Sequence, residues 1–128
     1  MDLKKFRFAK THEWATLDGN ICTIGLSQFA VEQLTDVIYI DLPDVGDPAI
    51  QGDSFGEIES VKAVSDMYSP VEGEIVAIND TLALDPTQVS KDPYGKGWLI
   101  KVKLEGKPSL DHMLTHEGYQ KQIAGNAH

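Results

Sequence analysis

The chain has 128 residues, of which 41% are hydrophobic and 24% charged, and its 11 basic and 20 acidic residues give a formal net charge of −9. This length and composition predict one soluble globular domain over residues 1–128, with a core that needs no disulfide or metal. The negative field repels phosphate backbones and anionic lipid headgroups, so nucleic acid and membranes are not expected as partners.

The cysteine content and the lack of long apolar runs indicate the compartment. A lone Cys22 cannot form an intramolecular disulfide, and its place in the alternating stretch ICTIGL predicts a buried, inert thiol. The start of the chain has no apolar stretch of signal-peptide length, and nowhere do about eighteen apolar residues run together. The sequence therefore predicts a cytoplasmic protein.

The first clear elements are a strand over 20–26 and a short helix within 27–36. NICTIGL is rich in β-branched residues and ends near a glycine, after which the hydrophobic period changes to that of a helix. Ser27 is a good candidate N-cap for this helix. It is the only helix expected in the first hundred residues.

Short strands punctuated by glycine and proline follow. Alternating or β-rich stretches predict strands at 37–43, 54–60, 64–70, 73–79 and 98–104. Residues 81–97 are rich in turn formers and are expected to form loops. The pattern indicates a mainly β sandwich or barrel.

The C-terminal segment, about 109–124, is expected to be helical. Leu110, Met113 and Leu114 have i, i+3, i+4 spacing, and Ser109 or Asp111 could cap one or two short helices there. These helices would pack on the sheet.

No catalytic constellation is apparent. The sequence has no GxGxxG, P-loop or CxxC motif, so dinucleotide, nucleotide and thioredoxin-like functions lack support. His112 and His116 are four residues apart, but the apolar neighbours Met113 and Leu114 favour a packed amphipathic segment over a metal pair. The sequence predicts neither a metal site nor an enzyme.

Lys62 stands out by its position between two predicted strands, 54–60 and 64–70. If these strands form a hairpin, the lysine lies at its protruding tip, with Gly52 and Gly73 at turns on either side. An exposed amine is protonated near neutral pH, and no adjacent group would activate it as a nucleophile. Lys62 is therefore better suited to attach a reactive group than to catalyse, although a lysine in a hairpin turn is also a common surface feature.

Four stretches resemble the H-protein of the glycine cleavage system, in order and over nearly the whole chain. They are THEWA (11–15), IGLSQFAVEQLTDVIYIDLPDVG (24–46), ESVKAVSDMYSPVEGEIVAIN (59–79) and DPYGKGWLIKVK (92–103). The ESVKA-SD stretch is the most specific, because other lipoyl domains usually have DKA at this point and biotin carriers have MKM. Neither tripeptide occurs here.

The resemblance implies a flattened barrel-sandwich hybrid of the lipoyl and biotinyl carrier type, mainly β, with one short internal helix and short C-terminal helices. It implies lipoate linked as an amide to Lys62, and lipoylating enzymes that recognise the residues around it. These residues are Glu59, Ser60, Val61 and Ala63.

The resemblance also implies partners. The lipoyl arm would take an aminomethyl group from the pyridoxal-phosphate glycine decarboxylase (P-protein) and pass it to the aminomethyltransferase (T-protein). Dihydrolipoamide dehydrogenase (L-protein) would then reoxidise the arm. The chain itself would be a carrier, expected to be monomeric when free. A relay that donates lipoyl or octanoyl groups to other carriers and an unmodified interaction module are the alternatives.

Because water can decompose the aminomethylated arm, a surface cleft is expected to shelter it. We expect Glu13 or Asp66 to pair with the amine of the cargo, with Thr11 as a polar neighbour. The alternatives are a surface charge at a turn or strand end for Glu13, and a polar position set only by hairpin register for Asp66.

Overall fold

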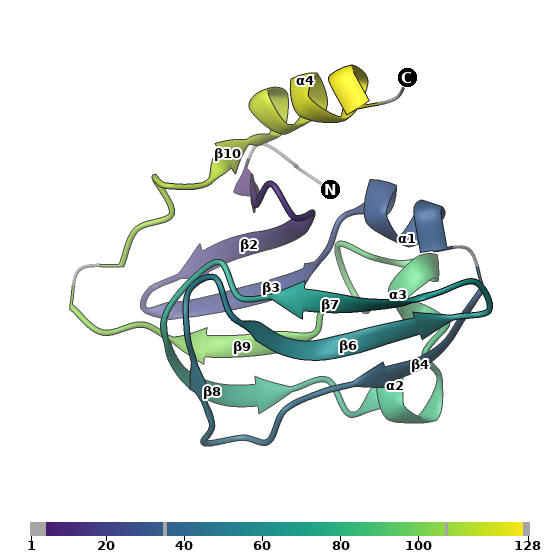
Figure 1. Cartoon of the computed structure of the whole chain (residues 1–128). Coiled ribbons are helices and arrows are strands. Elements are labelled where there is room, and N and C mark those ends of the chain that lie inside the picture. The colour runs from purple at the N-terminus through teal and green to yellow at the C-terminus, as the bar shows by residue number, and fades with distance from the viewer. Residues whose placement is uncertain (1–4, 35, 107, 127–128) are drawn as a thin grey trace.

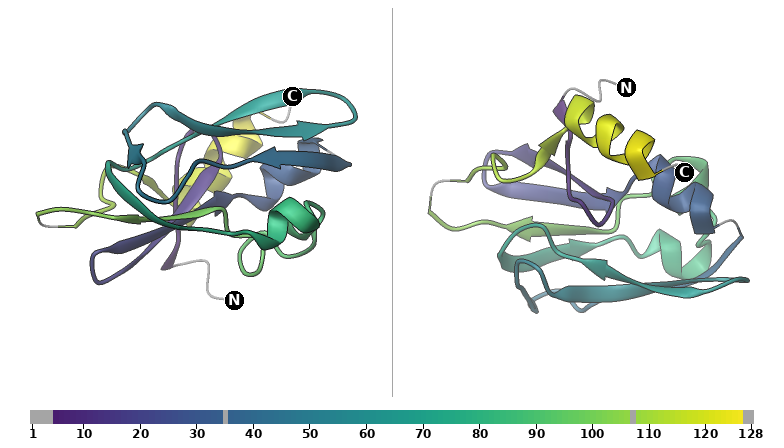
Figure 2. Two further views of the ribbon diagram at one scale, coloured as in Figure 1. Left: turned by 90° about the horizontal axis from the view of Figure 1, so that it is seen from below. Right: turned by 45° about the horizontal axis from the view of Figure 1, so that its top comes forward.

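A computed structural model describes residues 5–34, 36–106 and 108–126, and within them the fold is mainly β with two sheets (Figure 1). The larger sheet has seven strands in the order β10-β1-β2-β3-β9-β8-β5, and the smaller has three in the order β4-β6-β7. All their pairings are antiparallel. Figure 2 shows the two sheets as layers that face one another.

The strands of the larger sheet are β1 (Arg7–Phe8), β2 (Glu13–Asp18), β3 (Ile21–Leu26), β5 (Pro48–Ala49), β8 (Gly73–Ile78), β9 (Ile100–Lys103) and β10 (Leu114–Thr115). Those of the smaller sheet are β4 (Val37–Asp41), β6 (Ser54–Ser60) and β7 (Val64–Tyr68). Six strands, β3, β4, β6, β7, β8 and β9, thus lie where the sequence predicted them, and β6 has the predicted bounds.

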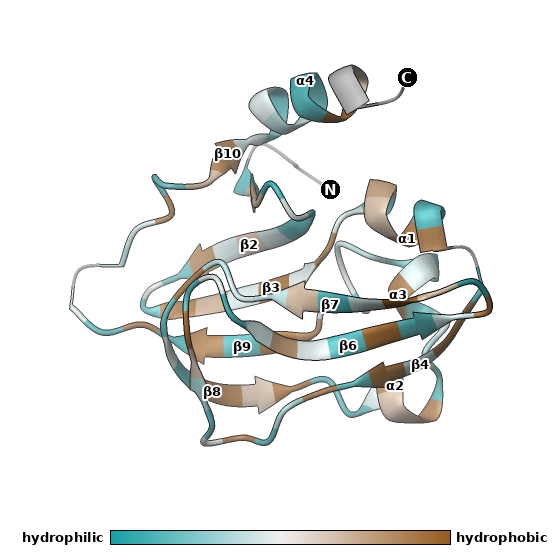
Figure 3. Cartoon of the chain, in the orientation of Figure 1, coloured by the Kyte–Doolittle hydropathy of each residue, from teal (hydrophilic) through white to brown (hydrophobic). Residues whose placement is uncertain are grey.

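The main core fills the space between the sheets because alternate strand residues turn their side chains inward. Ile58 on β6, Ile75 on β8 and Ile100 on β9 belong to one cluster of buried apolar residues, and each is at most 1% exposed. Alternating hydrophobic and hydrophilic bands mark this pattern along β6 and β9 (Figure 3). Cys22, predicted to be a buried thiol, is fully buried in the same cluster.

The helices are α1 (Gln28–Leu34), α2 (Thr81–Leu84), α3 (Gln88–Lys91) and α4 (His116–Asn126). The first confirms the predicted internal helix, and Ser27 caps it, since the Ser27 hydroxyl accepts the Ala30 amide at 3.2 Å. The expectation that no other helix occurs before residue 100 is wrong. Two single helical turns form in the turn-rich stretch because Leu82 and Val89 each anchor one of them in the core.

The C-terminal prediction is correct in type but not in position. Residues 108–113 form an irregular strap, Leu114 pairs with Phe8 as part of β10, and α4 begins only at His116. Leu110 and Met113 are buried as expected, but without a helix, because the strap itself lies against the core. The helix α4 packs against β1 instead through an aromatic cluster formed by Phe6, Phe8, Trp14 and Tyr119.

Candidate functional site

Lys62 lies in the turn between β6 and β7, at the right edge of Figure 1. The amide of Ser60 donates to the carbonyl of Ala63 at 2.8 Å, which closes a two-residue turn of Val61 and Lys62. The buried Ser60 hydroxyl accepts the amides of Lys62 and Ala63, each at 3.2 Å. Ser60 therefore fixes the turn from below, while the Lys62 side chain is exposed.

Of the two glycines predicted to lie at turns, only Gly52 does so. Gly52 has a φ of +89° and lies in a turn, as expected. Gly73 instead begins strand β8, where an added Cβ would lie 2.2 Å from the carbonyl oxygen of Lys103. Close strand packing, and not a turn, accounts for this second glycine.

Acidic side chains lie in register on the outer face of the smaller sheet, beside the turn. Glu57 on β6 lies opposite Asp41 on β4 and Asp66 on β7, and directly opposite residues share a face. Two positions along, Glu59 lies between Tyr39 and the exposed Val64. The described residues form no ion pair with these carboxylates, so the turn stands beside an uncompensated negative surface.

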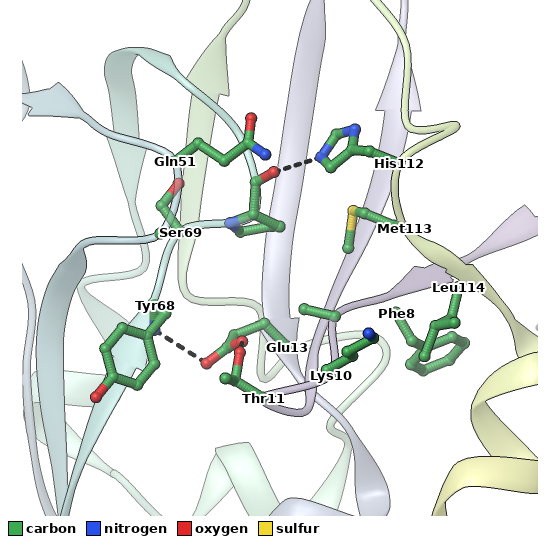
Figure 4. Close-up of a pocket in the computed structure, with 13 residues that line it drawn as sticks. Phe8, Lys10, Thr11, Glu13, Gln51, Tyr68, Ser69, His112, Met113 and Leu114 are labelled. Atoms are coloured by element: carbon green, nitrogen blue, oxygen red, sulfur yellow. Dashed lines mark hydrogen bonds between the residues drawn. The ribbon is translucent and has the colours of Figure 1, made fainter.

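Glu13 is 1% exposed, so the alternative of a surface charge is wrong. Its carboxylate accepts the Thr11 hydroxyl and, at 2.9 Å, the Tyr68 amide of β7 (Figure 4). Burial raises the pKa of Glu13, and these two hydrogen bonds oppose part of that rise. The arrangement is a desolvated carboxyl group that a cationic partner would favour in its ionised form.

The structure brings the three predicted cleft residues together. A cavity of about 220 Å³ is lined by Thr11, Glu13, Asp66 and its neighbour Ser65, together with His12, Leu26 and α1. The residues that α1 contributes are Phe29, Ala30, Gln33 and Leu34. Asp66 is exposed at the edge of this cavity, where the Tyr68 hydroxyl lies 3.5 Å from its carboxylate.

A larger cavity of about 510 Å³ is also lined by Thr11 and Glu13 (Figure 4). Pro70, His112 and Met113 help to line it, and Asp66 does not. The smaller cavity is the one that fits the predicted cleft, because Thr11, Glu13 and Asp66 all line it, whereas Asp66 does not line the larger one.

Two residues near the cleft were missed by sequence reasoning. His12 has a φ of +82°, which is rare for a residue with a side chain, and it lines the smaller cavity. Its ring nitrogen lies 2.7 Å from the hydroxyl of Tyr119 on α4. The stretch THEW offered a signal for His12, since it lies between the two nominated residues, but nothing near Tyr119 in sequence indicated this contact.

The described residues offer no metal centre. Within residues 5–34, 36–106 and 108–126, no three His, Cys, Asp or Glu side chains gather in a way that could hold a metal ion. His112 and His116 do not share a helix, since His112 binds the Pro70 carbonyl from the strap and His116 begins α4. None of the helices in this part of the chain has the length and apolar character that a membrane-spanning segment requires.

The chain is similar to known proteins over almost its full length. The family model described as "Glycine cleavage H-protein" matches residues 6–126. The glycine cleavage system H protein of Carboxydothermus hydrogenoformans is 48% identical, over 94% of this chain and 92% of that protein. The one of Rippkaea orientalis is 46% identical, over 98% of each.

A solved structure agrees with these sequence matches. The crystal structure of a glycine cleavage system H protein from Mycobacterium marinum has a TM-score of 0.86 and 34% sequence identity, and the match covers 94% of this chain and 98% of that one. It supports the mainly β, two-sheet fold. These matches show that the chain belongs to the glycine cleavage H-protein family.

Proposed function

We propose that this chain is the lipoyl-bearing shuttle of the glycine cleavage system, with lipoate joined to the Nζ of Lys62. It takes the aminomethyl group from the P-protein to the T-protein, and the L-protein reoxidises the arm with FAD and NAD. The observation that carries the proposal is the presentation of Lys62 in a tight, serine-braced turn of a chain from this family.

The surroundings of Lys62 fit amide attachment. Its side chain is exposed and, among the described residues, forms no ion pair, so a modifying enzyme can reach the Nζ. Acylation removes one positive charge and moves the formal net charge from −9 to −10. When bound, lipoate supplies a dithiolane that accepts a one-carbon unit and two electrons.

Lipoylating enzymes recognise the residues around the turn. Ser60 fixes the backbone, and the exposed Val61 and Ala63 give the tip an apolar surface on both sides of the lysine. Glu59 adds a charge on the outer face, where it can steer a basic enzyme surface toward the amine.

The smaller cavity supports the sheltering role. Asp66 follows Lys62 by four residues, about 13 Å along an extended strand, a distance comparable with the length of a lipoyl-lysine side chain. Within the cavity, Glu13 offers a buried carboxyl group and Thr11 a hydroxyl. A cationic amine would pair with Glu13 and compensate its burial, while the apolar α1 wall excludes water.

Intact mass tests the attachment. After co-expression with a lipoylating system, the wild-type chain should gain one lipoyl group and Lys62→Arg none. Lys96→Arg, which changes another exposed turn lysine, should be modified like wild type. A Lys62→Arg chain that still gained the group would disprove the site. A glycine decarboxylase assay with purified P-protein then separates the shuttle from the lipoyl or octanoyl relay, since only the shuttle supports turnover.

The shelter has its own test. Cargo-bearing Glu13→Gln and Asp66→Asn chains should release formaldehyde and ammonia several-fold faster than wild type when the T-protein is absent. Asp44→Asn, an exposed residue between β4 and β5, serves as the control for charge removal. Release at the wild-type rate from both cavity variants would rule out the shelter and leave attachment at Lys62 untouched.

A further inference from the structure

Tyr119 places one hydroxyl between two segments that are far apart in sequence. The side chain is 1% exposed, and its Oη lies 2.7 Å from His12 Nδ1 and 2.6 Å from Ser27 Oγ. The ring itself is stacked on Phe8, with 4.6 Å between ring centroids and 6° between planes. The aromatic contact therefore fixes where the hydroxyl lies.

The two partners of Tyr119 belong to two segments that line the 220 Å³ cavity. His12 stands between Thr11 and Glu13 in the turn that leads into β2, and its left-handed backbone sets the course of that turn. Ser27 caps α1, which supplies the apolar wall. Tyr119 does not line the cavity, so it acts on both walls from outside.

Further contacts tie the same parts together. The amide of Ser27 donates to the carbonyl of His12 at 2.9 Å, which links the two walls directly. One helical turn beyond Tyr119, the Gln122 side chain donates to the carbonyl of Lys10 at 3.0 Å. Helix α4 thus contacts the turn at residues 10 and 12, and the Tyr119 hydroxyl connects it to Ser27, which caps α1.

The hydrogen bonds from Ser27 to Tyr119 and from Tyr119 to His12 can both point in one direction. Burial lowers the pKa of His12, which favours the neutral ring, and we assign the tautomer in which Nδ1 accepts from the Tyr119 hydroxyl. Because the single Tyr119 proton is then directed to His12, the Ser27 hydroxyl is the donor to Tyr119 Oη, while the Ser27 oxygen accepts the Ala30 amide. Burial raises the pKa of Tyr119 to about 12, so the phenol remains protonated in neutral solution.

We propose that Tyr119 is a positioning residue that sets the separation between the Thr11–Glu13 turn and α1, and so determines how well the cavity shelters the cargo of the lipoyl arm. This inference rests on the shelter proposed above. Through Tyr119, the C-terminal helix controls a site that it does not touch.

Tyr119→Phe tests the inference without disturbing the aromatic stack. Amide hydrogen exchange is measured by NMR on the unmodified full chain, so lipoate is not needed. The Ser27 and Tyr68 amides bond to His12 and Glu13, respectively, and should exchange at least about fivefold faster once the hydroxyl is lost. Amides in strand β9, which lies on the other side of β3 from β2, should not change.

Tyr94→Phe is the matched control. Tyr94 packs in the same aromatic cluster and its hydroxyl accepts the Gln28 amide of α1 at 3.0 Å, but it has no hydrogen bond to the turn. Exchange at Ser27 and Tyr68 should stay at the wild-type rate in this variant. Wild-type exchange at both amides in Tyr119→Phe would overturn the positioning role.

Cargo release then separates the inference from the shelter on which it rests. In lipoylated, cargo-bearing protein without T-protein, Tyr119→Phe should release formaldehyde several-fold faster, whereas lipoylation of Lys62 should proceed at the wild-type rate. If Glu13→Gln accelerates release and Tyr119→Phe does not, the positioning role is wrong and the shelter stands. If neither variant accelerates release, the shelter fails and the inference falls with it.

Discussion

The carboxylate of Glu13, on β2 of the larger sheet, accepts the backbone amide of Tyr68, on β7 of the smaller sheet, at 2.9 Å. This bond joins the two sheets and satisfies a donor on an outer strand, a position where unpaired backbone groups invite unwanted pairing. A buried carboxyl group is an expensive way to make such a bond, which points to a use beyond stability.

Replacing Glu13 by glutamine should therefore stabilise the protein at neutral pH. The pKa of Glu13 is raised in the folded state, so the native chain holds the proton to higher pH than the unfolded chain, and stability falls as pH rises through that interval. Glutamine does not ionise, so its variant does not lose this stability, and its side-chain amide can still form hydrogen bonds with both Thr11 and Tyr68. Urea unfolding should give Glu13→Gln a higher free energy of unfolding at pH 7.

Below a pH of about 4, where the unfolded carboxyl group is also protonated, the advantage should largely vanish. The exposed Glu72→Gln controls for the loss of one charge and should show a smaller difference at pH 7. A Glu13→Gln chain less stable than wild type at pH 7 would contradict the prediction.

Ser60→Ala should slow lipoylation of Lys62. The Ser60 hydroxyl accepts the amides of Lys62 and Ala63, so its loss frees the turn and lowers the free energy of unfolding by about 1–2 kcal/mol. Mass spectrometry over a lipoylation time course measures the rate. Ser54→Ala, at the exposed far end of β6, should behave like wild type. Equal rates for all three chains would show that the backbone of the turn is not recognised.

Two glycine-to-alanine substitutions should change the stability of the protein in opposite directions. A Cβ at Gly25 would lie 2.5 Å from the Trp14 ring, inside the buried aromatic cluster, so Gly25→Ala should destabilise by about 1–3 kcal/mol. A Cβ at Gly118, in α4, meets only ordinary contacts at 3.4 Å and beyond, so Gly118→Ala should stabilise by about 0.5–1 kcal/mol. Thermal unfolding measures both, and shifts of the same sign would refute the pair.

Cys22 should not react in the folded protein. Burial raises the pKa of its thiol to about 12, so hardly any thiolate is present at pH 8. A thiol-reactive dye should label the native chain at least a hundredfold more slowly than the urea-unfolded chain. Rapid native labelling would mean that the β3 core opens readily.

The features that sequence could predict are local ones. The β6–β7 hairpin depends on alternation and on a short turn, both of which lie within residues 54–68, and its tip was predicted correctly. The Ser27 cap likewise acts on a residue three positions away. The single turns α2 and α3 were missed because one buried residue each, and no repeating pattern, holds them.

The cleft depended on contacts that no local pattern contains. Glu13 is buried because β7 lies over it, 55 residues along the chain, so its neighbours alone could equally fit a surface turn. Tyr119 is 107 residues from His12 and 92 from Ser27. Asp66 was placed near the cleft only through the family resemblance, since an exposed residue at that register would look the same in any hairpin.

The pairing of β1 with β10 also has a consequence for synthesis. Arg7 and Phe8 pair with residues 114–115, which are synthesised more than 100 residues later. The β1–β10 pairing can therefore form only after most of the chain has left the ribosome. The hairpin around Lys62 pairs within residues 54–68, and its other neighbour in the sheet, β4, precedes it in the chain. On a growing chain, the turn that presents Lys62 can therefore form before the contacts of Tyr119 with His12 and Ser27 are made.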